Sequence, residues 1–397
     1  MKLNNHSFLI AGQLKTGLLE PLEIYLKSST SALGVIGTTS PFLTVNLSRC
    51  TLYEANSKQK TQKLSAFLIH KVTKNNRPLM IISYLAFVFN YLKAVFFLNR
   101  RFDVFIGISS FSALLGIFLK KVGMVDVVIY YCLDFYPNPK TRDFMGFVNY
   151  LFRHVERYLI KNSDFVWDLS PKISIARESQ LNIPQSSYKK IVVPVGYSQA
   201  ITRIVPLEKR ERWTIGFIGS VSPNQGLELV VNAMPELLVK FPELKVKIIG
   251  HGTDVYRLRK MISDKMLDKH FIFHGFIANE NEAYEILSHC VIGLATYTGD
   301  ITDNSSYSEP GKPKLYMLLG LPIVITSKTS IATDITKYHA GISIDYTERQ
   351  FIEAVTHLIE TDEEVNTYYS GVRAYQPQCA SERIYERAFE QTNISHS

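Results

Sequence analysis

The sequence is poor in cysteine and in the motifs that cysteine builds. Its 397 residues include four cysteines, which lie far apart and form no CxxC pair. This spacing excludes a zinc ribbon and indicates reduced thiols in a cytosolic setting. Zinc-finger spacings and RNA-binding aromatic signatures are also missing, and the basic residues are dispersed along the chain. We therefore expect no nucleic-acid partner.

A secretory signal is missing as well. The chain begins MKLNNHSFLIAG, and the short apolar run that ends in a glycine turn predicts a first strand. A hydrophobic content of 46% with 20% charged residues is typical of a folded protein, and 397 residues predict two domains. The net charge of +8 indicates an anionic partner, either nucleotide phosphates or an anionic membrane.

One apolar segment is nearly long enough to span a bilayer. Residues 78–98 are mostly apolar and are flanked by Arg77, Arg100 and Arg101. A spanning helix is one interpretation. We favour a buried or membrane-apposed helix, because Ser83, Asn90 and Lys93 interrupt the run, and an apolar strand follows it. The run 111–122 contains Lys120 and Lys121 and is similar. The expected location is cytoplasmic, peripheral at the inner face of the cell membrane, with an anionic membrane surface as partner.

Strand and helix patterns alternate in both halves of the chain. This order predicts an α/β protein with right-handed crossovers and parallel sheets. We expect an acceptor-side domain over residues 1–205 and a second domain over residues 206–375. Nearly every predicted strand of the second half ends in small or polar residues, and open parallel sheets bind ligands at those carboxyl ends.

The segment 309–325, EPGKPKLYMLLGLPIVI, is the most informative part of the sequence. Pro310, Gly311 and Lys312 open a predicted short helix, and Gly320 and Pro322 end it before an apolar strand. A lysine at the start of a helix favours an anion such as phosphate. The alternative is an ordinary helix–strand unit in which Lys312 is solvated.

This segment resembles the donor site of GT-B glycosyltransferases, through Pro310-x-Lys312, Tyr316 and Gly320-x-Pro322. The continuation at 330–332 and 340–342 resembles bacterial sugar transferases of the galactofuranosyltransferase type. The resemblance implies two Rossmann-like domains that face each other across a cleft, with a nucleotide-sugar as substrate and no cofactor. It further implies that a C-terminal helix within 376–397 packs back on the first domain.

The chain departs from that family pattern at two places. Many retaining members carry an arginine and a lysine in the turn where this chain has Gly219-Ser220 and Gln225-Gly226. Their paired glutamates, eight residues apart, correspond to Tyr307 and Leu315. Lys312 is therefore the best remaining cation of the predicted site, and inverting and retaining transfer both stay open.

Asp134 is the candidate general base, because it lies just past an apolar strand and could deprotonate an acceptor hydroxyl. Its surroundings resemble the YxxDxxP segment of some GT-B enzymes, and the alternative is an Asp that caps a turn before Pro137. The resemblance and the glycine turns together predict the following donor-binding residues: Gly219, Ser220, Gly250, His251, Gly252, Glu309, Pro310, Gly311 and Lys312. The predicted acceptor-binding residues are Gly12, Lys15, Thr16 and Ser109.

We expect no metal site, because Asp300 and Asp303 do not form an Asp-x-Asp motif. The polar stretch 298–308 is predicted to be a loop that could close over the donor. The expected activity is transfer of a sugar from a nucleotide-sugar to a hydroxyl of a glycan or lipid-linked acceptor, in bacterial surface polysaccharide synthesis. A nucleotide- or carbohydrate-binding protein without catalysis, or a nucleotide-sugar epimerase, would share these features.

Overall fold

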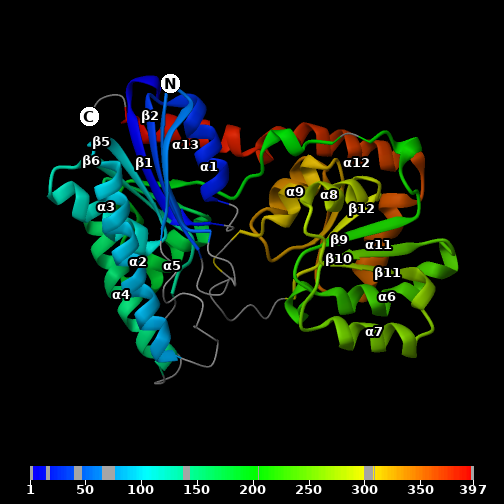
Figure 1. Cartoon of the computed structure of the whole chain (residues 1–397). Helices are drawn as coiled ribbons and strands as arrows, with labels where there is room; N and C mark the ends of the chain where they lie inside the picture. Colours follow the sequence, from blue (N-terminus) through cyan, green and yellow to red (C-terminus); the bar gives the residue numbers. More distant parts are fainter. Residues whose placement is uncertain are drawn as a thin grey trace. The chain divides into compact units, whose positions relative to one another are not determined.

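The computed structural model describes residues 3–14, 18–39, 47–64, 77–136, 144–203, 205–298, 307 and 309–394, with the helical backbone alone at 77–87 and 144–145. The chain divides into two compact units (Figure 1). Unit 1 comprises Met1–Val195 and Ile384–Ser397, and unit 2 comprises Gly196–Arg383.

Unit 1 is built on an eight-stranded sheet of order β4-β3-β2-β1-β5-β6-β7-β8. Its strands are β1 Ser7–Gln13, β2 Ala32–Thr38, β3 Arg49–Glu54, β4 Ser57–Lys63, β5 Phe102–Ile108, β6 Val125–Cys132, β7 Phe165–Asp168 and β8 Lys190–Val192. All neighbouring pairs are parallel except those that involve β3 and β4. Strands such as β2 are buried along their whole length, as in a sheet that helices cover on both faces.

The β3–β4 hairpin departs from the parallel sheet that the alternating pattern predicts. Ala55 and Asn56 link the two strands with φ of 46° and 64°, the left-handed pair that a tight hairpin turn needs. β4 reads SKQKTQK and is largely exposed at the sheet edge. A lysine-rich edge strand discourages pairing with other chains, so it carries no hydrophobic signal for sequence reasoning to detect.

The helices of unit 1 are α1 Leu19–Ser29, α2 Arg77–Leu98, α3 Ser110–Lys121, α4 Phe144–Asn162, α5 Pro171–Leu181 and, from Ile384 onward, α13 Ser381–Thr392. α2, α3 and α4 lie alongside one another (Figure 1). The Tyr91 hydroxyl of α2 lies 2.8 Å from the Ser112 hydroxyl of α3, and the Phe111 and Phe152 rings are 5.6 Å apart. Within the described part of the chain, no helix combines the length and apolar character that crossing a bilayer requires.

Unit 2 contains a fully parallel six-stranded sheet of order β11-β10-β9-β12-β13-β14. Its strands are β9 Thr214–Ile218, β10 Lys245–Ile249, β11 Phe271–Gly275, β12 Ile292–Ala295, β13 Ile323–Thr326 and β14 Gly341–Ile344. Its helices are α6 Leu227–Lys240, α7 Val255–Asp264, α8 Glu280–Ser288, α9 Lys312–Leu318, α10 Ala332–Lys337, α11 Glu348–Ile359 and α12 Asp362–Tyr375. One core packs under α6, α7 and α11, and another under α8, α9, α10 and α12.

The units divide at Val195 and Arg383 instead of at residues 205 and 375. Hydrogen bonds explain both shifts. The Tyr197 amide donates to the Cys379 carbonyl at 3.2 Å, and the Ser381 amide donates to the Tyr197 carbonyl at 2.8 Å. Residues 196–205 and 376–383, which the sequence assigned to the first domain, are therefore hydrogen-bonded to each other within unit 2.

The last helix contributes aromatic side chains to the core of unit 1. The Phe389 ring lies 5.6 Å from Phe8 and 5.0 Å from Trp167, and the Trp167 indole donates to the Thr392 hydroxyl at 3.1 Å. Unit 1 thus depends on residues from both ends of the chain.

We expect Phe389→Ala to destabilise unit 1 by about 3–5 kcal/mol, because it empties a buried aromatic site. Urea unfolding followed by Trp167 fluorescence, in a Trp213→Phe background, reports on unit 1 alone. The matched control Phe96→Ala removes a ring of unit 1 that is 83% exposed and should change stability by less than about 0.5 kcal/mol. Equal unfolding midpoints for the two variants would contradict a structural role for the C-terminal helix.

Candidate functional site

Three glycines bring the ends of β9 and β10 of unit 2 into close contact. A Cβ on Gly250 would lie 1.9 Å from the Gly219 carbonyl oxygen, and one on Gly252 would lie 2.1 Å from the Val221 oxygen. Gly219 and Gly250 also have φ of 133° and 137°, where side chains are rarely tolerated. The predicted glycine turns therefore form one compact backbone surface. Ser220 and His251 lie in these turns and are exposed.

Lys312 lies against this surface. A Cβ on Gly219 would be 3.4 Å from the Lys312 Nζ, so the lysine end lies in contact with this turn. The ammonium group lies 4.3 Å from the centre of the Phe217 ring and 5.1 Å from that of Tyr297, and it donates to the Gln225 side-chain oxygen. Pro310 and Gly311 precede it, and Gly311 caps α9. The structure thus brings most of the predicted donor-binding residues together.

Burial lowers the pKa of Lys312 to about 7. Aromatic faces and one amide oxygen replace its water, and within the described residues no carboxylate forms an ion pair with it. An unpaired buried cation is costly unless a ligand neutralises it. Since α9 has only seven residues, the anion-attracting feature is the lysine charge and not the helix dipole.

The two departures from the family pattern have local explanations. Gln225 occupies the place of a family lysine and instead accepts the hydrogen bond of Lys312. Leu315 is 4% exposed and belongs to the core under α9, where a carboxylate would have no water. Tyr316 is also structural, since its hydroxyl accepts from the Ile218 amide and donates to the Leu294 carbonyl, both at 3.1 Å.

Glu309 is engaged in an ion pair. Its carboxylate lies 3.0 Å from the Lys314 Nζ, and both side chains are almost fully buried. Lys314 is the other lysine at the start of α9, and this ion pair engages it with Glu309. The pair therefore fixes the segment that leads into α9 and leaves Lys312 as the cation next to the glycine turns. Most of the predicted loop 298–308 lies outside the described residues.

The predicted acceptor residues of unit 1 lie at the carboxyl edge of neighbouring strands. Gly12 is near the end of β1, Ser109 directly follows β5, and Asp134 comes two residues after β6. The Ser109 amide donates to the Tyr131 carbonyl at 3.0 Å. Ser109 has a φ of 94°, a strained conformation of the kind found at functional sites. Lys15 and Thr16 lie outside the described residues.

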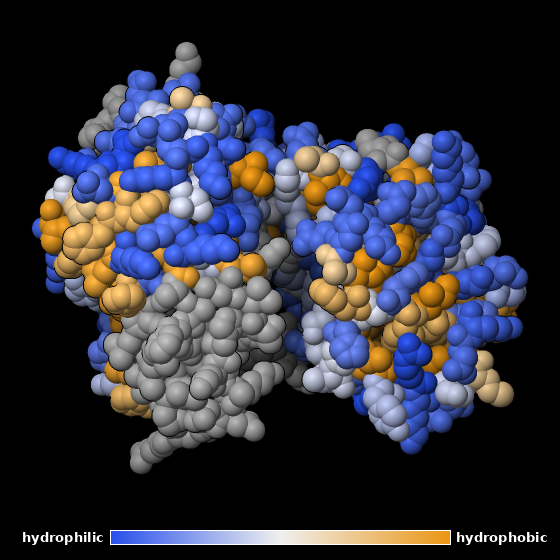
Figure 2. All heavy atoms as spheres, in the orientation of Figure 1, coloured by the Kyte–Doolittle hydropathy of each residue, from blue (hydrophilic) through white to orange (hydrophobic). Residues whose placement is uncertain are grey.

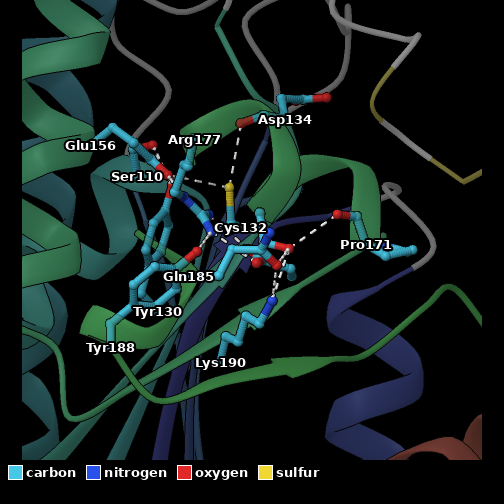
Figure 3. A network of polar contacts seen from close by, with 12 residues as sticks. Ser110, Tyr130, Cys132, Asp134, Glu156, Pro171, Arg177, Gln185, Tyr188 and Lys190 are labelled. Atoms are coloured by element: carbon cyan, nitrogen blue, oxygen red, sulfur yellow. Dashed lines mark hydrogen bonds and ion pairs between the residues drawn. The ribbon is translucent and has the colours of Figure 1, made fainter. Parts of the chain in front are cut away.

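Asp134 is exposed at the surface, yet partial loss of water raises the pKa of its carboxyl above the ordinary value. Figure 3 shows its side chain directed away from a buried polar network behind it. The Cys132 thiol, which belongs to that network, donates to the Asp134 main-chain oxygen at 3.4 Å. The network therefore supports the backbone that carries the candidate base.

Arg177 is the centre of this network and is completely buried. Its two terminal nitrogens donate to both oxygens of Asp168, at 2.8 and 2.7 Å, and its Nε donates to Glu156 at 2.5 Å. The Tyr130 hydroxyl donates to the second Glu156 oxygen at 2.7 Å. Desolvation alone would lower the pKa of Arg177, but the two carboxylates outweigh it and raise that pKa, so the guanidinium stays charged.

Sequence reasoning did not find this network. Asp168 stands at the end of an apolar strand, while Glu156 and Arg177 lie on two different helices. The available signal was Asp168, a charged residue at the end of an otherwise apolar strand, since buried charges must be paired.

Residues 212–361 match the protein family described as Glycosyl transferases group 1. This match covers most of unit 2 and less than half of the chain. No curated protein is significantly similar to the chain in sequence.

Solved structures resemble the chain over nearly its whole length. HepE from Anabaena, in complex with UDP, aligns with a TM-score of 0.64 at 12% identity, covering 98% of this chain and 99% of that one. Sucrose-phosphate synthase from Thermosynechococcus elongatus aligns with a TM-score of 0.66 at 11% identity, covering 99% and 100%. The pneumococcal O-GlcNAc transferase GtfA, in complex with UDP and GlcNAc, aligns with a TM-score of 0.57 at 14% identity, covering 89% and 68%. These likenesses confirm the predicted α/β fold with two Rossmann-like domains of the GT-B type.

We expect Lys312→Met to weaken binding of a nucleoside diphosphate at least tenfold, because charge-assisted hydrogen bonds contribute about 1.5–3 kcal/mol. In the free protein at pH 8, Lys312 is mostly neutral, since its pKa is about 7. A bound diphosphate favours the charged form, so nucleotide binding at pH 8 should take up close to one proton, and much less at pH 6. Calorimetry in two buffers of different ionisation enthalpy measures this uptake. The exposed control Lys240→Met should keep the wild-type nucleotide affinity and proton uptake. If Lys312→Met took up as many protons as the wild type, Lys312 would not belong to the site.

We expect Arg177→Met to destabilise unit 1 by about 3–5 kcal/mol, because it leaves two buried carboxyl groups without a cation. Desolvation already raises the pKa of Asp168 and the arginine counteracts that rise, so removing the arginine raises this pKa further. The variant should therefore lose more stability at pH 8 than at pH 5. Adding Asp168→Asn and Glu156→Gln should restore part of the loss, whereas the exposed control Arg349→Met should be neutral. A loss that does not vary with pH would mean that the carboxyls are not charged in the native protein.

Proposed function

We propose that the chain transfers a sugar from a nucleotide-diphosphate donor to a hydroxyl group of a glycan or lipid-linked acceptor. The observation that carries this proposal is the partly buried Lys312, which has no carboxylate partner among the described residues and lies beside Gly219. A diphosphate supplies the negative charge that this cation lacks, and the glycine backbone lets a phosphate approach closely. The group 1 glycosyltransferase match of unit 2 supports the same donor class.

The donor base that we propose is uracil. HepE has been solved with UDP-glucose, and GtfA with UDP and GlcNAc. We extend this donor class to the present chain because its unit 2 has the same fold and a glycine surface at the carboxyl edge of the sheet. The sugar that the motif at 330–342 favours is galactofuranose, and the pathway that we propose is bacterial surface polysaccharide synthesis.

In the proposed reaction, an acceptor hydroxyl forms a bond to the anomeric carbon while the bond to the diphosphate breaks. Lys312 stabilises the negative charge that develops on the leaving diphosphate. Asp134 accepts the proton of the acceptor hydroxyl. Attack by that hydroxyl in a single displacement inverts the anomeric configuration, whereas a retained configuration requires a different path. The anomeric signal of the product in an NMR spectrum distinguishes the two.

The test incubates the protein with UDP-glucose, UDP-GlcNAc or UDP-galactofuranose and with glycan or polyprenyl-linked acceptors. A donor-dependent mass increase of the acceptor supports the proposed transfer. Tight donor binding without any product would indicate a binding protein, and conversion of the donor sugar into an isomer would indicate an epimerase. A thermal-shift screen of the same donors identifies the nucleotide first, because a ligand that binds the native state raises its melting temperature.

We expect Asp134→Asn to lower kcat by roughly 10²–10⁴-fold, the usual contribution of a general base. Donor affinity should stay unchanged, since Asp134 belongs to unit 1 and the donor residues to unit 2. Because the pKa of Asp134 is raised, the acid limb of the kcat/KM profile should lie above the pH typical of an ordinary aspartate. The matched control Asp126→Asn, near the opposite end of β6, should keep wild-type turnover. Normal turnover of Asp134→Asn would move the base to another residue.

A further inference from the structure

The outer faces of α2, α3 and α4 are apolar although they are exposed. Phe96 of α2 is 83% exposed, Phe89 is 61% exposed, and Phe147 of α4 is 56% exposed. The helix surfaces and the α3 end show the following exposed apolar side chains: Val88, Phe89, Leu92, Phe96, Phe118, Val122, Phe147, Tyr150, Leu151 and Tyr158. We call this set the outer face. Figure 2 shows hydrophobic surface in the left part of the view, where Figure 1 places these helices.

The spacing of these side chains shows that they form stripes. Val88, Leu92 and Phe96 follow one another at intervals of four residues, as do Phe118 and Val122. Such intervals place residues on a single side of a helix. The opposite sides of the helices carry buried residues such as Tyr91, Ala94 and Leu159. A surface helix is normally polar on its outer side, so these helices have a second apolar face that needs a partner.

The charges on the same helices are almost all positive. α2 carries Arg77 and Lys93, α3 carries Lys120 and Lys121, and α4 carries Arg153, Arg157 and Lys161, against Glu156 as their single acidic residue. Glu156 is buried against Arg177, so no acidic side chain of these three helices faces outward. The whole chain, by contrast, has 44 basic and 36 acidic residues. The positive charge is therefore concentrated beside the outer face.

Some of the basic side chains near the outer face form ion pairs within unit 1, and others do not. Arg100 pairs with Glu54 at 2.5 Å, Arg101 pairs with Asp126, and Lys120 lies 2.5 Å from Asp164. The flanking cations that the sequence suggested are thus largely neutralised within unit 1. Lys121, Arg157 and Lys161 are exposed and lack an ion-pair partner among the described residues. The Lys121 ammonium lies 2.9 Å from the Tyr158 hydroxyl of the outer face.

We propose that the outer face docks onto the surface of an anionic lipid bilayer. Aromatic and aliphatic side chains would enter the boundary between headgroups and acyl chains, while Lys121, Arg157 and Lys161 would contact lipid phosphates. A second copy of this chain fits less well, because a symmetric contact would place two positively charged faces against each other. This proposal does not depend on the transfer reaction, although it would bring unit 1 to a lipid-linked acceptor.

The first test measures co-sedimentation with vesicles of phosphatidylcholine alone or with one quarter phosphatidylglycerol. Wild-type protein should bind the anionic vesicles at least tenfold more tightly than the neutral ones, and added salt should weaken that binding. The variant in which Gln replaces Lys121, Arg157 and Lys161 should bind the anionic vesicles at least tenfold more weakly than the wild type. Equal binding to both vesicles, or none to either, would overturn the proposal.

The second test separates insertion from charge attraction. The variant with Phe89→Ser, Phe96→Ser and Phe147→Ser should also lose at least tenfold in binding to the anionic vesicles. The control with Val239→Ser and Tyr256→Ser removes side chains that are each 82% exposed on unit 2, and it should bind like the wild type. The fluorescence of Phe96→Trp should be quenched by brominated acyl chains. A concentration-dependent dimer without lipid, abolished by the triple Ser variant, would instead make this face a self-association surface.

Discussion

The structure of unit 2 at its predicted site depends on a partly buried lysine that has no counter-charge among the described residues. Lys312 lies against the turn at Gly219 and is surrounded by Phe217, Tyr297 and the Gln225 amide. Each of these neighbours lowers the exposure of the lysine to water, and none supplies a negative charge. The free energy lost in this way is recovered when an anion binds, which makes the site selective for negatively charged ligands.

In unit 1, by contrast, the buried cation is paired with carboxylates of the same unit. Arg177 is surrounded by two carboxylates, so the charge is neutralised inside the fold and no ligand is needed. A residue of this kind rigidifies the strand ends, and through Cys132 it supports the main chain at Asp134. The buried lysine is thus suited to binding and the buried arginine to positioning, although both lie where parallel strands end.

The sequence predicted the elements that follow strong patterns, including the parallel strands of unit 2 and the glycine turns beside Lys312. It did not reveal contacts between residues distant in the chain. Gln225 and Lys312 are 87 positions apart, and the carboxylates of Arg177 come from a strand and another helix. The β3–β4 hairpin was missed because β4 is polar on both faces. The segments 196–205 and 376–383 belong to unit 2, where Tyr197 is hydrogen-bonded to Cys379 and Ser381, and local composition does not encode such bonds.

Ser220 and Gln225 of the turn carry no charge, and this affects how a diphosphate would be held. Lys312 is then the cation that lies beside the glycine turns. Two further cations beside Lys312 would repel it and lower its pKa further, because like charges disfavour the protonated form. With a single lysine near pH 7, the positive charge forms largely when the anion arrives. Binding and protonation are then coupled, so the site avoids the full cost of a permanent buried charge and still neutralises the leaving diphosphate.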